Sequence, residues 1–294
     1  MNNRFDLKIS FMRFLICKNG FRISKKALIV FLLLLTASLF SQTQGGYYNL
    51  VYSKMGVIGS IEFNGMSILS ESKGDDVSGQ IDLNVWILPG VNKIKVKGLM
   101  KRKEDEVAPR IKAVLYLGQK GQFPDEGQKI AGYEWEEATG LKVKLPIEEV
   151  ITFTPSEIPP SDLWKSAEVI QLNAEDKEKI QKLITDLFDG FQKKDEKKLL
   201  QLMEFRTKEF ARARYISPDE EIKDLKKGVK SILKSVGGKL DKLELNDLQY
   251  QLIADNKVVS VFTKAGNSPI ENKKIGFSIP LFLSKIQGEW VISR

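Results

Sequence analysis

The sequence predicts an α+β protein of two domains, because two regions of the chain carry different hydrophobic periods. From Tyr47 to about Phe153 apolar and polar residues alternate, which is typical of strands with one buried face. From Asn173 the apolar residues recur at helical spacing, and after Gly238 the alternation returns. This order predicts an N-terminal antiparallel β-sandwich, followed by a domain of three helices and a curved antiparallel sheet.

The first 41 residues have the layout of a secretory signal. A positive flank at 24–26 precedes an apolar stretch of 14 residues at 27–40, and Ser41 is a small residue suited to cleavage. A membrane-spanning helix needs roughly 20 apolar residues. We therefore expect residues 1–41 to be a cleaved signal peptide, with an uncleaved anchor or a buried helix as alternatives. Met12 is a second candidate start. The mature protein is expected to be periplasmic or secreted.

The net charge of +8 is concentrated in this leader. Residues 1–41 carry +6, and the remainder carries only +2, which does not fit a nucleic-acid-binding domain. The chain has no histidine, and this excludes Ser-His-Asp and Cys-His catalysis and metal sites that need imidazole. Its one cysteine, Cys17, lies in the leader, so we expect no disulfide in the mature protein. No residue pattern indicates a cofactor.

The first domain, residues 46–154, is predicted to contain seven or eight short strands. Asn64-Gly65 is the strongest hairpin signal, because both residues tolerate positive φ. A strand is expected to run through Trp86 and Leu88 to a turn at Pro89-Gly90. The stretches "RIKAVLYLG", "KIAGYEWEEA" and "GLKVKLPIE" continue the series. The hairpin "WILPGVNKIKVKG" resembles those of Ig-like and jelly-roll accessory domains, and this weaker resemblance, over residues 46–155, implies a module for sugars or proteins.

A short, stiff linker is predicted at 155–164. The segment from Thr154 to Trp164 contains three prolines, which lack amide donors and favour extended backbone before them. The second domain then spans 165–294. Its predicted caps and turns are, in chain order, Asn173, Asp195, Ser217-Pro218, Gly237-Gly238, Asp255-Asn256 and Gln287-Gly288.

Residues 173–294 resemble the NTF2-like fold, named for nuclear transport factor 2. The passage "LFDGFQKKDEKKLLQLM" resembles that between the family's first two helices, and "IPLFLSKIQGEWVISR" resembles its last strands. The resemblance implies a cone-shaped pocket between sheet and helices, with Leu281, Leu283 and Ile286 toward its interior. Trp290 and Ile292 are expected to seal the sheet against the helices. No single function follows, because members of the family include enzymes, binders and scaffolds.

Tyr250 is the candidate pocket residue. It alternates with Leu248 and Leu252, so its side chain is expected to face inward with the leucines. Its hydroxyl either lines a pocket or belongs to a core tyrosine. The absence of histidine excludes the dehydratase-type dyad of the NTF2-like group, but a Tyr-plus-Asp or Asp-Arg-Asp arrangement stays open.

Arg206, Arg212 and Arg214 are the candidate partner-binding residues. They lie with Lys208 in the densest arginine cluster after the leader, and guanidinium groups suit carboxylates and phosphates. The alternative is a solvated helix end, where cations are favoured. Tyr133 and Trp135 share one strand face, which indicates core, with a sugar platform as the alternative.

These observations favour an exported, non-enzymatic binding protein of the cell envelope. One version is an inhibitor or immunity-type protein that caps a protein partner. A small-molecule binder or histidine-independent enzyme that uses the cone is the first alternative, and a structural envelope module is the second. No metal or nucleic-acid partner is expected, nor a stable transmembrane anchor if the signal is cleaved.

Overall fold

The fold is known from a computed structural model that describes residues 45–71, 76–101, 108–137 and 144–294. Gly45 to Arg294 form one compact unit. The predicted signal segment 1–41 lies outside the described residues, as do the first four residues of the predicted strand 140–148. Within the described ranges, none of the helices combines the length and the hydropathy that a membrane span requires.

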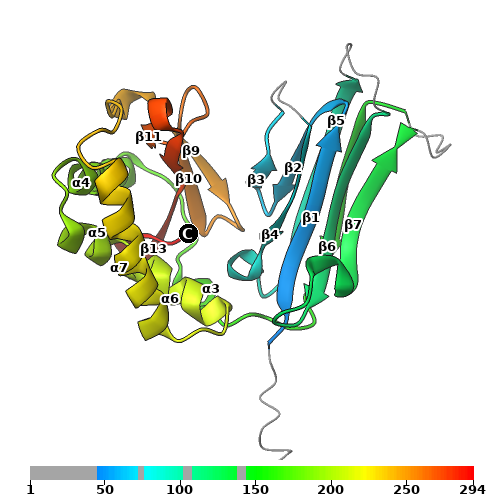
Figure 1. Ribbon diagram of the computed structural model, residues 1–294, viewed down its shortest axis with the longest axis horizontal. Coiled ribbons are helices and arrows are strands. Elements are labelled where there is room, and N and C mark those ends of the chain that lie inside the picture. The colour runs from blue at the N-terminus through cyan, green and yellow to red at the C-terminus, as the bar shows by residue number, and fades with distance from the viewer. Residues whose placement is uncertain (1–44, 72–75, 102–107, 138–143) are drawn as a thin grey trace, which may run out of the picture. The chain divides into compact units, whose positions relative to one another are not determined.

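The described chain is α+β, as predicted, and its first part consists of two four-stranded antiparallel sheets (Figure 1). Each sheet joins strands that are not consecutive in sequence. One has the order β4 (Val77–Asp82), β1 (Tyr47–Met55), β6 (Arg110–Gly118) and β7 (Gln128–Glu136). The other has the order β3 (Met66–Leu69), β2 (Val57–Phe63), β5 (Asn92–Lys101) and β8 (Ile147–Phe153).

Both sheets contribute to one hydrophobic core. Alternate residues such as Leu50 and Leu115 in one sheet, and Phe63 and Ile94 in the other, are fully buried and belong to the same cluster. The period of two in the sequence therefore corresponds to one buried face per strand. Trp135 is buried in this core and Tyr133 packs against it, as the core interpretation of these two aromatics predicts.

The Asn64-Gly65 turn forms as predicted, with φ of 50° and 85°. The predicted strand through Trp86 and Leu88 is wrong, because β4 ends at Asp82 and a 3₁₀ helix (η1, Asn84–Trp86) follows. The Asn84 side chain accepts a hydrogen bond from the Tyr48 backbone amide at 2.7 Å. It also donates to the carbonyl of Ala213 at 2.7 Å. Such side-chain bonds to backbone compete with strand pairing and stabilise the turn here.

Helices dominate the next part of the chain, after a short helix α3 (Leu163–Ser166). Two of the predicted caps act through their side chains: Asn173 accepts from the amide of Asp176 at 2.8 Å, and Asp195 accepts from that of Lys198 at 3.0 Å. The remaining helices are α4 (Ala174–Gln192), α5 (Glu196–Leu202), α6 (Glu204–Ala213) and α7 (Pro218–Ser235).

The predicted second helix is two helices. Met203 ends α5 and begins α6, with φ of −94° and ψ of 0°. Neither proline nor glycine marks this break in the sequence. Leu199 and Met203 are both buried in the same core cluster as α4 and α7, so packing fixes the change of direction.

The last sheet has the order β14 (Glu289–Ile292), β13 (Leu281–Ile286), β10 (Val258–Thr263) and β9 (Leu248–Ile253). This is the predicted four-strand meander, with turns at Asp255-Asn256 and Gln287-Gly288. A two-stranded sheet, β11 (Ile270–Asn272) with β12 (Phe277–Ile279), is inserted between β10 and β13.

One face of this sheet packs against the helices. Val259, Val261, Leu281 and Leu283 are buried in one cluster with α4 residues such as Ile184. Trp290 and Ile292 seal the sheet against the helices, as expected, and belong to the same cluster. Ile286 differs from the expectation, because it packs against the core of the first two sheets.

Candidate functional site

The three candidate arginines lie on or just after α6, but their environments differ. Arg212 pairs with Asp162, and its Nη1 lies 3.4 Å from the Glu209 carboxylate. Arg214 follows the last residue of the helix and is 31% exposed. The guanidinium groups of Arg212 and Arg214 are therefore neutralised by carboxylates of this same chain, that of Arg214 by Asp82.

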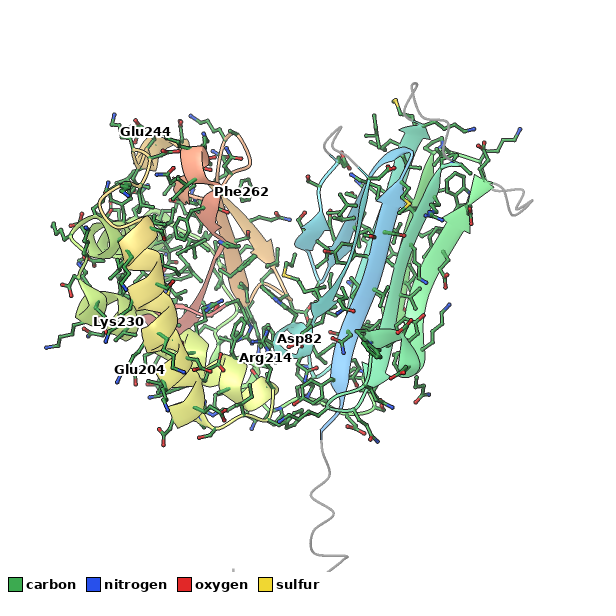
Figure 2. The ribbon with its side chains drawn as sticks, in the orientation of Figure 1. Asp82, Glu204, Arg214, Lys230, Glu244 and Phe262 are labelled. Carbon is green, nitrogen blue, oxygen red and sulfur yellow. The ribbon has the colours of Figure 1, made fainter. Side chains whose placement is uncertain are left out.

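The Arg214 side chain reaches strand β4. Its Nε–H donates to the Asp82 carboxylate at 2.6 Å, and both residues are labelled in Figure 2. Its carbonyl oxygen accepts a hydrogen bond from the Tyr47 hydroxyl at 2.6 Å. These contacts join the end of α6 to strands β1 and β4, which are neighbours in one sheet (Figure 1).

Arg206 makes no ion pair with any described residue. Its guanidinium carbon lies 4.4 Å above the Phe210 ring, and that of Arg214 lies 4.8 Å from the same ring. Burial lowers the pKa of Arg206, the nearby charge of Arg214 lowers it further, and Glu221 opposes this. Of the three candidates, Arg206 is the one whose charge is not paired with a carboxylate of a described residue, and it is therefore the best placed to bind an acidic partner.

Sequence reasoning missed the buried carboxylate of Glu209, which lies one helical turn before Arg212. It is 1% exposed and accepts hydrogen bonds from Ser161 Oγ at 2.7 Å and from the amides of Asp162 at 2.9 Å and Leu163 at 3.1 Å. This carboxylate fixes the end of the predicted linker onto α6. A charged residue in a charged helix carries no signal that it will be buried, so only the fold reveals it.

Arg294 is the second charge buried beside Glu209. Its Nη1 lies 3.5 Å from the Glu209 carboxylate, and its guanidinium carbon lies 4.8 Å from the Trp164 ring centre. Burial lowers the pKa of Arg294 to about 10, against the opposing effect of Glu209. The pair is a structural one, because neither side chain reaches the surface.

Tyr250 faces the helices, as expected, but it lines none of the three grooves considered below. The residue packs against the helix-side cluster, and its buried hydroxyl has no hydrogen-bond partner among the described residues. Burial raises the pKa of Tyr250. The nearby side chain of Gln181 opposes this rise, although it is not placed to form a hydrogen bond with the hydroxyl. The Lys177 ammonium lies 5.7 Å from the ring centre. Leu252, expected on the same face, is 36% exposed.

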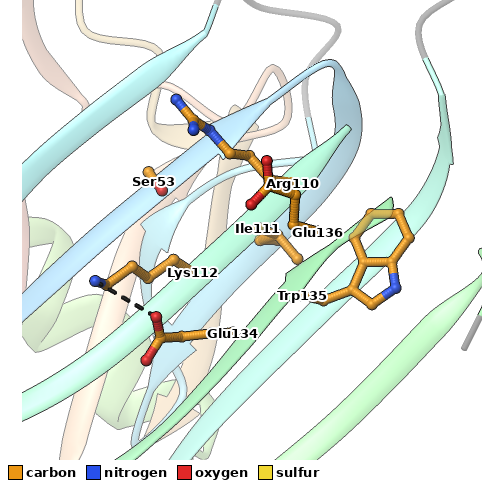
Figure 3. A pocket seen from close by; sticks show the side chains of 7 residues that line it. All are labelled: Ser53, Arg110, Ile111, Lys112, Glu134, Trp135 and Glu136. Carbon is orange, nitrogen blue, oxygen red and sulfur yellow. Dashed lines mark ion pairs between the residues drawn. The ribbon is translucent and has the colours of Figure 1, made fainter. Parts of the chain in front are cut away.

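A first groove, of about 370 Å³, lies beside strands β6 and β7 (Figure 3). Two of its four charged side chains pair with each other: Glu134 lies 3.5 Å from Lys112, marked by the dashed line, and also 2.8 Å from Lys129, which lies outside the groove. The hydrogen bond from Lys129 lowers the pKa of Glu134. The indole of Trp135 belongs to the core beneath. The Glu134 carboxylate is therefore already engaged by two lysines and is a poor contact for a ligand.

A second groove, of about 530 Å³, is lined by Val91, Lys93, Val150 and Leu252, and we name it the partner groove. The three aliphatic side chains are 52%, 54% and 36% exposed, although they come from distant parts of the sequence. Lys93 is exposed and forms no ion pair with a described residue. Lys95, in the same groove, is paired with Glu148 at 2.8 Å.

The Asn64-Gly65 turn forms one wall of the partner groove. The Asn64 side chain donates to the carbonyl of Trp86 at 3.0 Å and accepts from the amide of Lys93 at 2.8 Å. Its backbone carbonyl accepts from the amide of Ala254 at 2.9 Å. A turn predicted from local sequence is thus also the point where the β2–β3 hairpin meets the β9–β10 turn.

Comparisons of the chain with protein-family models, with curated proteins and with solved structures gave no match. Within the described residues, no group of three or more acidic or cysteine side chains is arranged to hold a metal ion.

Proposed function

We propose that this protein is an exported binding protein of the cell envelope that docks a protein partner in the partner groove. The observation that carries the proposal is the gathering of Val91, Val150 and Leu252 in one concave surface. Exposed aliphatic side chains that cluster, rather than scatter, mark interaction sites. A surface of this kind binds an apolar segment of a partner and releases the water that covers both.

Charge supports a partner of one particular chemistry. Lys93 and Asp255 both line the groove, are exposed and form no ion pair with a described residue, so an aliphatic segment with a carboxylate near Lys93 and a cation near Asp255 matches these features. Arg206 is a second candidate contact for an acidic partner, because it lacks a carboxylate of its own among the described residues. Arg212 and Arg214 would have to exchange internal partners to bind. An inhibitor or immunity-type role is the version of this function that we favour.

The finer fold assignment belongs to the same proposal. Helices α4 to α7 before an antiparallel meander of order β14-β13-β10-β9 support an NTF2-like domain after a β-sandwich. The split second helix and the inserted β11–β12 pair depart from the expected three helices and plain meander. The division of the chain at residues 155–164 is part of the proposal. Residues on its two sides are joined by hydrogen bonds, from Asn84 to the carbonyl of Ala213 and from Arg214 to Asp82.

The docking proposal is tested by placing a photoreactive amino acid at Leu252 or Val150 of the full-length protein in cells. We expect one discrete adduct from both positions, and its loss when Lys93→Glu is added. The matched control is the same amino acid at Phe123, which is 72% exposed and outside the groove. Equal adducts from Phe123, or adducts that survive Lys93→Glu, would contradict the proposal.

Export is tested separately. When the full-length chain is expressed, we expect the protein to be recovered outside the cytoplasm with the mass of a chain whose first residue is near Gln42. We expect a chain that lacks residues 24–41 to stay in the cytoplasm. Cytoplasmic recovery of the full-length chain would contradict the export proposal while leaving the docking test intact.

A further inference from the structure

A third groove, of about 370 Å³, opens on the face of the last sheet that is turned away from the helices. We name it the neutral groove and define it by Ser67, Gln251, Ser260, Phe262, Ser278 and Phe282. Ser260 and Phe262 alternate along β10 with Val259 and Val261, whose side chains are buried against the helices. The register places Gln251, Ser260 and Phe282 in one row across β9, β10 and β13.

None of the described residues that line this groove is charged, although 29% of the residues in the chain are. A charged ligand would lose part of its hydration in the groove, and no opposite charge would compensate for it. The lining therefore selects an uncharged ligand.

The same lining is rich in hydrogen-bonding groups that the fold does not use. The hydroxyls of Ser67, Ser260 and Ser278 and the amide of Gln251 make no hydrogen bond with any described residue, and all four side chains are at least partly exposed. The Ser268 hydroxyl also lines the groove but is used by the fold, because it donates to the carbonyl of Ile270 at 3.2 Å and supports the adjoining loop. Several hydroxyls and an amide, each able to donate and accept, match a ligand that itself carries many hydroxyls.

Two phenyl rings complete the surface. The Phe282 ring meets the Trp86 ring edge to face, with centroids 4.9 Å apart, so its position is fixed by the core. Phe262, labelled in Figure 2, is partly exposed and belongs to neither core cluster. Its ring is free to receive the C–H face of a sugar ring, and binding sites commonly combine such aromatic surface with a few polar groups.

We propose that the neutral groove binds an uncharged saccharide. Its volume lies at the lower end of the range for small-ligand pockets, which is about 300–1,000 Å³, and this favours a disaccharide unit over a long chain. The site is distinct from the partner groove, although Gly65 lines both. The proposal therefore does not depend on a protein partner.

The test is saturation-transfer NMR of the protein expressed from its full-length sequence and purified, with four neutral disaccharides: maltose, lactose, cellobiose and N,N′-diacetylchitobiose. We expect transfer to at least one of them, unchanged between about 50 and about 500 mM salt, because no ion pair contributes. In Phe262→Ala the affinity should fall at least about tenfold. Ser260→Ala and Ser278→Ala should each weaken binding less, and Phe123→Ala should leave it unchanged.

Circular dichroism and thermal melting of each variant separate loss of binding from loss of fold. Three results would overturn the proposal: no transfer to any of the four disaccharides, equal transfer in folded Phe262→Ala, or transfer only to an anionic sugar such as glucuronate. Preferential binding of an Ala-Ser-Ala-Ser peptide that is uncharged because its N-terminus is acetylated and its C-terminus amidated would also overturn it, and would assign the groove to peptides.

Discussion

The Nε–H of Arg214 donates to the carboxylate of Asp82 over 2.6 Å, and the two residues are 132 positions apart in the chain. Both side chains are only about a quarter to a third exposed, at 31% and 26%. An arginine whose position in the sequence suggested a contact for a partner thus makes an ion pair within its own chain. The functional question about the cluster moves from Arg214 to Arg206.

We predict that Arg214→Ala lowers the free energy of unfolding by about 1–2 kcal/mol, because a charge-assisted hydrogen bond between partly buried groups is lost. Asp82→Asn should cost a similar amount, and a double-mutant cycle in urea should show that the two effects are not additive. Lys182→Ala, which breaks an exposed helical pair with Asp186, is the control and should have little effect. Additive effects of the Arg214 and Asp82 changes would contradict the pairing.

Glu209→Gln should be the most destabilising of the charge changes, by about 3–5 kcal/mol, because it leaves the Arg294 guanidinium buried without a counter-charge. It also disturbs the bonds to Ser161 and to the amides of Asp162 and Leu163. Denaturant unfolding measures the loss. Glu204→Gln, at the exposed start of α6, is the matched control. Equal stability of the two variants would show that the buried carboxylate does not hold the linker.

Asp176 should make stability fall in acid. The Asp176 carboxylate is 4% exposed and accepts from Lys285 Nζ at 3.0 Å and Trp290 Nε1 at 3.1 Å. Burial alone would raise the pKa of Asp176, but the hydrogen bonds from these two residues outweigh it and the pKa is lowered. A lowered pKa in the folded state stabilises the fold above pH about 3.9, and this contribution is lost as the pH falls through the folded pKa.

The measurement for Asp176 is the free energy of unfolding from pH about 2 to about 7. Asp176→Asn should cost about 2 kcal/mol at neutral pH and nothing at the acid end, which flattens the curve. Glu178→Gln, an exposed change in the same helix, should keep the acid fall of the wild type. A curve for Asp176→Asn parallel to that of the wild type would refute the assignment.

Tyr250→Phe should raise the free energy of unfolding by about 1 kcal/mol, because it removes a buried hydroxyl without a hydrogen-bond partner among the described residues. The matched control is Tyr48→Phe. The hydroxyl of Tyr48 donates to the Glu157 carbonyl at 2.8 Å, so its removal should lower the free energy of unfolding by about 1 kcal/mol. Thermal melting compares the two. A destabilised Tyr250→Phe would indicate that the hydroxyl has an essential interaction, as the pocket interpretation requires.

Much of the secondary structure could be predicted because it depends on local rules. The Asn64-Gly65 and Gln287-Gly288 turns need positive φ, which asparagine, glutamine and glycine provide here. The Asn173 and Asp195 caps satisfy amides three residues ahead. The turn at η1 and the break at Met203 could not be predicted, because Asn84 bonds to Tyr48 and Ala213, and Met203 packs in a core assembled from several helices.

The candidate sites show the same division. The sequence by itself determined the α+β class, the hairpin turns, the helix caps and the exclusion of histidine-dependent chemistry, because composition, periodicity and capping act within a few residues. Only the tertiary structure decided which arginine keeps a free charge, that Glu209 is buried, and that exposed aliphatic and neutral polar residues gather into grooves. Those properties depend on the neighbours that the fold brings together from distant positions, and no local pattern encodes them.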